Sequence, residues 1–403
     1  MTLNIEQTPL VIEGIRLGAA NAGIKPGSTR LDLAVIELAD GASCAATFTR
    51  NAFCAAPVVV ARENLAHHVV RYLVINSGNA NAGTGKEGLL AAERCCLALA
   101  DLRGTLVESV LPFSTGVIGE LLPVERLTAA LPAACETLSE SGWEQAARAI
   151  MTTDTVAKVA SARIHIDGQA IRITGMAKGS GMIHPDMATM LAYVATDAVI
   201  PQEALDALIP ELVADSFNCI TVDGDTSTND ACVLMATGRG SATAMQEDGV
   251  HPTLREGLQA VFNSLAQQII RDGEGATKFI TIEVEGGESV DACRQVAFTI
   301  AHSPLVKTAF FASDPNWGRI LAAIGRAGLP NLDIARIVIS LDDVTIVREG
   351  GRNPGYTEEA GARVMAQGDI TIGVRLGRGE CSCRIWTTDL SYDYVKINAE
   401  YRT

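Results

Sequence analysis

The chain has 403 residues, of which 48% are apolar and 20% are charged, and its formal net charge is −15. This length is enough for two or three domains with a large core. The acidic balance, without any basic run, argues against nucleic acid or an anionic membrane as a partner. No stretch approaches the roughly 18 apolar residues that a membrane span needs, and the N-terminus lacks the features of a signal peptide. We therefore expect a soluble, cytoplasmic protein that also buries apolar surface in an oligomer.

The cysteines and histidines show no spacing typical of a metal site, although the chain has ten of the first and six of the second. Cys95 and Cys96 are adjacent in an expected helix, and Cys381 and Cys383 alternate along an expected strand. The acidic run at 218–230 lacks the glutamate that closes an EF-hand loop. We expect buried cysteines that act as small apolar side chains, no metal and no cofactor.

Hydrophobic periodicity predicts a chain of mixed strands and helices. In order, the expected elements are strands over 30–38 and 69–75, helices over 88–102 and 123–139, a hairpin over 160–174, a helix over 202–217 that is kinked near Pro210, and helix 253–271. After these come strands over 279–284, 335–341, 344–348, 370–376 and 380–386 and a helix over 357–367. Together they indicate an α/β fold with a smaller C-terminal α/β lobe at about 286–388. The tail from Tyr394 alternates and is amphipathic, so we do not expect a frayed end.

The stretch 178–197 combines an unusual backbone with a hydroxyl that can react. Gly179 and Gly181 permit positive φ at the entry to an apolar element. Thr189 lies in this bend, after the small residue Ala188. If the Thr189 hydroxyl attacks the carbonyl of Ala188, an ester forms that water can open, and a new chain then begins at Thr189.

Such a cut would create a nucleophile together with its base. The new α-amine would have an unperturbed pKa of roughly 7.7–8.0, so it can accept the hydroxyl proton near neutral pH. An N-terminal threonine is one of the known ways to activate a hydroxyl for acyl transfer. The spacing by itself fits a plain turn before a core element equally well.

The sequence Met-Ala-Thr-Met-Leu at 187–191 resembles the self-processing segment of the ornithine acetyltransferases, which are glutamate N-acetyltransferases of arginine biosynthesis. Further segments similar to that family are 76–82, 114–119, 218–230 and 303–320, so the resemblance covers essentially the whole chain. It implies a layered α/β/β/α sandwich of the type shared with a self-cleaving aminopeptidase family. It also implies an α chain, 1–188, and a β chain, 189–403, that stay associated as an α2β2 heterotetramer.

The resemblance also implies the roles of individual residues. The nucleophile is Thr189, the oxyanion hole is formed by Thr115 and the N–H of Gly116, and substrate is contacted by Thr153, Lys178, Glu274, Asn398 and Thr403. Without the resemblance each residue has an ordinary interpretation. Thr115 and Gly116 would lie in a loop, the polar residues at 152–155 would form a capping cluster, and Lys178 and Glu274 would be solvated charges.

The implied reaction is a double displacement. Thr189 Oγ attacks the acetyl carbonyl of N2-acetylornithine, ornithine leaves, and glutamate takes the acetyl group from acetyl-Thr189. Acetyl-CoA as a second donor stays open. Two alternatives also remain: an aminopeptidase or amidase with the same nucleophile, in which water replaces glutamate, and a non-catalytic assembly protein, which would remain one unbroken chain.

Overall fold

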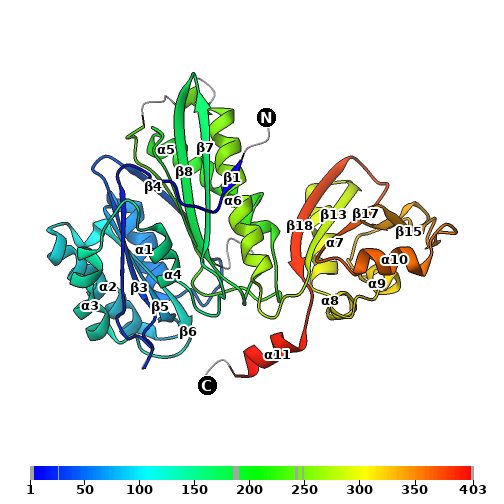
Figure 1. Ribbon diagram of the computed structural model, residues 1–403, viewed down its shortest axis with the longest axis horizontal. Helices are drawn as coiled ribbons and strands as arrows, with labels where there is room; N and C mark the ends of the chain where they lie inside the picture. Colours follow the sequence, from blue (N-terminus) through cyan, green and yellow to red (C-terminus); the bar gives the residue numbers. More distant parts are fainter. Residues whose placement is uncertain (1–3, 26, 185–189, 241–243, 247–248, 401–403) are drawn as a thin grey trace. The chain divides into compact units, whose positions relative to one another are not determined.

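The computed structural model describes the chain apart from residues 1–3, 26, 185–189, 241–243, 247–248 and 401–403. Two compact units divide it (Figure 1): Met1–Asn218 with Asp225–Ile269, and Cys219–Gly224 with Ile270–Thr403. None of the helices in the described residues is long and apolar enough to cross a membrane.

The first unit contains two larger sheets and a short ribbon. The six-stranded sheet has the order β1 (Ile5–Glu6), β7 (Lys158–Ile166), β8 (Gln169–Lys178), β9 (Leu191–Thr196), β10 (Ala231–Ala236) and β4 (Ser43–Phe48). The four-stranded sheet has the order β2 (Ile15–Ala20), β3 (Leu33–Leu38), β5 (Tyr72–Asn79) and β6 (Val110–Val117). The ribbon pairs β11 (Met245–Gln246) with β12 (Gly249–Val250). Both larger sheets are mixed, because β9–β10 and β5–β6 are parallel and the other pairs are antiparallel.

Helices cover the outer faces of these two sheets (Figure 1). The four-stranded sheet carries α2 (Gly85–Arg103) and α3 (Val124–Glu136), and the six-stranded sheet carries α5 (Gln202–Ala214) and α6 (Pro252–Arg271). The remaining helical segments are α1 (Ala56–His67), α4 (Trp143–Ala149) and the short 3-10 turns Val107–Ser109 and Phe217–Cys219. Gly257 of α6 lies against two isoleucines of the β7–β8 hairpin, and a Cβ there would be 2.9 Å from Ile173 Cδ1. The layers are therefore helix, sheet, sheet, helix, as expected.

Alternation along the strands builds two separate cores. Ile36 and Ile75 face the space between the sheets, whereas their neighbours Val35 and Val74 face α2 and α3. Each fully buried side chain of this size contributes about 1.5–3 kcal/mol relative to an exposed one. Between the sheets, Phe113 of β6 meets a tyrosine of β9 edge to face, with ring centroids 5.4 Å apart. Strands β6 and β9 thus face each other across the core.

The second unit is one mixed sheet with helices. Its strand order is β16 (Gly351–Arg352), β15 (Val344–Arg348), β14 (Val338–Leu341), β17 (Asp369–Arg375), β13 (Phe279–Gly287) and β18 (Cys381–Thr388). Only β13 and β17 are parallel among these neighbours. The helical segments are α7 (Val290–Ala301), α8 (Pro304–Phe311), α9 (Trp317–Gly325), the turn Ile334–Arg336, α10 (Glu358–Met365) and α11 (Tyr392–Ala399).

Most expected elements are confirmed with ends shifted by a few residues. Helix α5 continues through Pro210 to Ala214, three residues short of the expected end. From Tyr394 to Ala399 the tail lies in α11, which agrees with the expectation that it is not frayed. Ser391 begins this helix by accepting a hydrogen bond from the N–H of Tyr394, a typical N-cap.

Candidate active site

Lys178 is the last residue of β8 and is bound by side chains from the neighbouring segments. It lies opposite Leu191 in the β8–β9 pairing and is 8% exposed. Its Nζ donates hydrogen bonds to Thr152 Oγ1 (2.8 Å) and Thr115 Oγ1 (3.3 Å) and lies 3.9 Å from Asp154 Oδ2. Lys178 is therefore not a solvated charge, and it joins the predicted oxyanion residue Thr115 to the segment that contains Thr152.

Asp154 is the buried anion that compensates two lysines. Its Oδ1 accepts hydrogen bonds from Lys158 Nζ (2.6 Å) and from the N–H of Gly179 (2.7 Å), and its Oδ2 accepts one from the N–H of Thr152 (3.0 Å). Burial opposes ionisation of Asp154, but the ammonium groups of Lys178 and Lys158 outweigh it and hold the pKa of this carboxyl well below its usual range. Asp154 thus anchors the site, and its assignment to a capping cluster is wrong.

The bend after β8 packs against the same segment. Gly179 has φ of 151°, the region that glycine favours, as expected. The second positive φ falls on Met182 (54°) and not on Gly181. Thr153, a predicted substrate contact, shares a hydrogen bond of 2.7 Å with the hydroxyl of Ser180. Thr153 is therefore held by the bend after β8, whereas Thr152 is held by Lys178 at the end of that strand.

The sequence alone suggests a loop at Thr115 and Gly116. In the structure both residues lie at the end of strand β6. Gly116 has φ of 133°, and a Cβ there would lie 2.3 Å from the carbonyl carbon of Gly78 and 2.6 Å from the nitrogen of Asn79. No L side chain fits such a close approach of two backbones. The geometry at this strand end therefore requires glycine.

The acidic run before β10 ties β6 to β9. Asn229 is buried, and its Nδ2 donates to the carbonyl oxygens of Ser114 (2.9 Å) and Ala80 (2.6 Å). Asp230 follows, and burial raises its pKa well above the usual value. The next residue donates its N–H to the carbonyl of Met190 at 3.0 Å. Sequence reasoning gave this segment no role, although its match to the family marked it as important.

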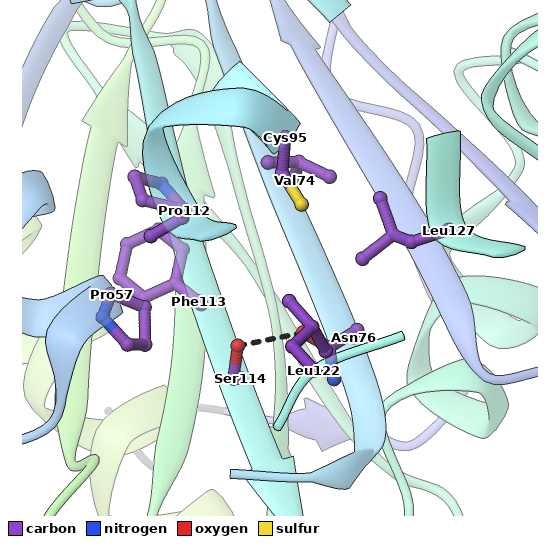
Figure 2. Close-up of a pocket in the computed structure, with 10 residues that line it drawn as sticks. Pro57, Val74, Asn76, Cys95, Pro112, Phe113, Ser114, Leu122 and Leu127 are labelled. Carbon is purple, nitrogen blue, oxygen red and sulfur yellow. Dashed lines mark hydrogen bonds between the residues drawn. The ribbon is translucent and has the colours of Figure 1, made fainter. Parts of the chain in front are cut away.

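A small cavity lies on the helix side of β6 (Figure 2). Ser114 and Asn76 point toward each other there, and Ser114 Oγ donates a hydrogen bond of 2.6 Å to Asn76 Oδ1. Apolar side chains such as Val74 and Leu127 line the rest of its volume of about 10 Å³. This is close to the least volume that one water needs and far too small for an amino acid. The cavity belongs to the packing that supports β6.

In the second unit, two predicted substrate contacts lie together. Glu274 is only 7% exposed, and Asn398 of α11 donates a hydrogen bond of 2.8 Å from Nδ2 to Glu274 Oε2. The following residue, Gly275, has φ of 68°, and a Cβ there would lie 2.5 Å from Ser391 Oγ. Ser391 Oγ in turn donates to the carbonyl oxygen of Gly275 at 2.7 Å. Glu274 is therefore a fixed, buried carboxyl and not a solvated turn charge.

The predicted cleavage residues Ala188 and Thr189 and the predicted contact Thr403 lie outside the described residues. Within the part of the chain that the structure describes, no three His, Cys, Asp or Glu side chains gather in a way that could hold a metal ion. The arrangement offers hydroxyls, ammonium groups, carboxylates and a glycine N–H as its chemical groups.

Comparison with known proteins adds the family. The sequence model of the ArgJ family matches residues 16–403. The chain belongs to the ArgJ family. This membership confirms the resemblance to the ornithine acetyltransferases that we inferred from the motif at 187–191. The matched residues include the ends of β6 and β8 and the turn at Glu274.

Three ArgJ relatives illustrate the similarity. The arginine biosynthesis bifunctional protein ArgJ of Methylococcus capsulatus is 59% identical over 393 residues, which cover 97% of this chain and 96% of the relative. The protein of that name from Pseudomonas fluorescens is 54% identical over 395 residues and 97% of each chain. The crystal structure of the ArgJ protein of Bacillus halodurans is 39% identical with a TM-score of 0.51, and covers 53% of this chain and 100% of that chain.

Proposed function

We propose that this chain transfers an acetyl group from N2-acetylornithine to glutamate in arginine biosynthesis, through an acetyl group carried on Thr189. Membership of the ArgJ family supports the pathway, since relatives at 54% and 59% identity are named for arginine biosynthesis. The observation that carries the chemistry is the convergence of Thr115, Thr152 and Lys178, because Lys178 is paired with Leu191, two residues after the proposed nucleophile.

The proposed sequence of events begins with a cut between Ala188 and Thr189, which frees the α-amine of Thr189. Thr189 Oγ then attacks the acetyl carbonyl while that amine accepts the hydroxyl proton. Thr115 Oγ1 and the N–H of Gly116 donate to the oxyanion that develops, an interaction that gains strength as negative charge forms. Ornithine leaves with a proton, and glutamate attacks acetyl-Thr189 by the same route in reverse.

The proposed substrate contacts follow the charges of the substrate. Lys178 and Thr153 would bind the α-carboxylate, which both substrates have, so one set of groups can serve both half-reactions. Glu274, held by Asn398, would bind the side-chain ammonium of N2-acetylornithine, and Thr403 would complete the contacts. The buried position of Lys178 and Glu274 supports this assignment, because electrostatic attraction is stronger away from water.

The proposed scope includes a second donor. The relatives from Methylococcus and Pseudomonas are both named bifunctional. This favours acetyl-CoA as an additional source of the acetyl group for glutamate, with the enzyme itself working without a bound cofactor. We also propose that the two pieces stay associated as an α2β2 heterotetramer.

Paired variants of the nucleophile test this function. Thr189→Ala should run as one band of about 42.4 kDa and show no transfer. Thr189→Ser, which keeps a hydroxyl and the new amine, should still be cut and should still transfer acetyl. Mass spectrometry of the wild-type enzyme with N2-acetylornithine alone should find one acetyl group on the new N-terminal residue. Residual cutting of Thr189→Ala at the same bond would contradict the scheme.

The two alternative functions predict different products. An amidase would release acetate with or without glutamate and would not show ping-pong kinetics with the two amino acids. An assembly protein would remain one chain and give no acetyl adduct. The described geometry gives no observation that favours either over acetyl transfer.

A further inference from the structure

Lys307 is a buried lysine of the second unit that the proposed reaction does not use. It lies on α8, is 5% exposed, and donates from Nζ to Thr387 Oγ1 (3.2 Å) and to the carbonyl oxygen of Thr388. Burial lowers the pKa of Lys307 to about 8, and the carboxylates of Asp389 and Asp223 limit this fall. The side chain is therefore mainly protonated at pH 7, and a buried ammonium persists only where such partners compensate it.

The end of β18, which Lys307 binds, is hydrogen-bonded to the turn that follows Glu274. Thr388 Oγ1 donates to the carbonyl oxygen of Lys278 at 2.9 Å. Asp389 Oδ1 accepts the backbone N–H groups of Thr277 (2.8 Å) and Lys278 (2.9 Å), and its Oδ2 accepts the Thr277 hydroxyl (2.6 Å). One carboxylate thus receives three hydrogen bonds from two consecutive residues. The residues at the end of β18 therefore bind both the N–H groups of residues 277–278 and the carbonyl oxygen of Lys278.

The same strand end fixes the other side of the turn. Ser391 donates to the carbonyl of Gly275, and α11, which Ser391 caps, contributes Asn398 to the carboxyl of Glu274. Helix α8 is also tied to this segment, since the N–H of Leu390 donates to the carbonyl of Lys307 at 3.3 Å. Each of these bonds lies within residues 274–278, 307 and 387–398.

We propose that Lys307 is a positioning residue for substrate recognition: it fixes residues 387–391, and through them the turn that presents Glu274 to the side-chain ammonium of N2-acetylornithine. The inference rests on the proposed role of Glu274. Selectivity for an amino acid with a cationic side chain then depends on Lys307, although Lys307 does not contact the substrate. Glutamate has no such ammonium, so its half-reaction should depend on Lys307 far less.

The test is a comparison of the two substrates in ping-pong kinetics. Lys307→Met removes the ammonium and keeps most of the apolar stem. We expect the KM for N2-acetylornithine to rise about tenfold while kcat and the KM for glutamate change less than about twofold, the pattern of lost binding without lost chemistry. Glu274→Gln should give the same split with a larger rise. Arg384→Met is the matched control, because Arg384 is a cation on β18 that pairs with Glu283 instead of the turn.

A second variant keeps the test decisive if Lys307→Met does not fold. Thr387→Val removes one acceptor of the ammonium with little change of volume and should raise the same KM by about threefold. Equal losses for both substrates, or unchanged kinetics in both variants, would overturn the role of Lys307. A normal KM for N2-acetylornithine in Glu274→Gln would instead refute the assignment of Glu274. Absence of acetyl transfer by the wild type would refute the proposed function itself.

Discussion

Two ion pairs of the first unit have the same sequence spacing and nearly the same N–O distance but differ in burial, and they allow a direct test of how the site is stabilised. Asp154 and Lys158 are four residues apart with a charge separation of 2.6 Å and no exposed side-chain surface. Glu144 and Arg148 are also four residues apart, at 2.7 Å, but their side chains are 61% and 62% exposed. We predict that loss of the acidic partner costs far more in the first pair than in the second.

The magnitudes follow from what each variant leaves behind. Asp154→Asn keeps the shape but removes the carboxylate that pairs with the buried ammonium of Lys158 and lies beside that of Lys178. Breaking a buried pair in this way typically costs about 3–5 kcal/mol, because the remaining charge is desolvated and uncompensated. Glu144→Gln leaves Arg148 in water, so it should cost roughly 0.3–0.5 kcal/mol, the usual value of an exposed pair at this spacing.

Urea unfolding, followed by tryptophan fluorescence, measures this difference. The ionised form of Asp154 stabilises the fold because its pKa is lower in the folded state than in the unfolded chain. The stabilisation is therefore complete above the ordinary carboxyl pKa and disappears as the pH falls through the lowered folded value. The gap between wild type and Asp154→Asn should be constant from pH 6 to 8 and shrink only in acid. Equal midpoints for the Asp154 and Glu144 variants would refute the reasoning.

Two further predictions concern single sites. Gly116→Ala should lower kcat for acetyl transfer by about a hundredfold, because a Cβ would force a shift of the backbone whose N–H we propose stabilises the oxyanion. Gly119→Ala is the control, since Gly119 also has positive φ but no atom within 4 Å of its Cβ; equal kcat values in the two variants would contradict the expectation. Burial raises the pKa of Cys44 and Cys95 to about 12, so both thiols should resist iodoacetamide at pH 8 in the native enzyme and react in urea, as peptide mass spectrometry can measure.

Sequence reasoning succeeded where structure is decided locally. The apolar residues of α6 recur at steps of three and four, and residues such as Leu258 and Leu265 are fully buried as that spacing predicts. The hairpin of β7 and β8 turns at Asp167 and Gly168, and both take positive φ, as the Asp-Gly pair favours. In each case the deciding information lies within about twenty consecutive residues.

It failed where partners come from distant segments. Asp154 and Lys178 are separated by a whole hairpin, so only the β7–β8 pairing brings the lysine back to the carboxylate. Strand β4 was also missed, because its small residues show no clear alternation when the strand is buried on most sides. By contrast, α11 could have been predicted, since Ser391 followed by Asp393 is a typical helix start.

The two groups of predicted site residues differ in the sign of their charge. Asp154 carries one negative charge against the two positive charges of Lys158 and Lys178. These three residues together therefore carry one net positive charge in a chain whose total is −15. Glu274 has the opposite sign, and its partner Asn398 is neutral. If both groups contact the substrate as we propose, their charges are complementary to the carboxylate and the ammonium of N2-acetylornithine.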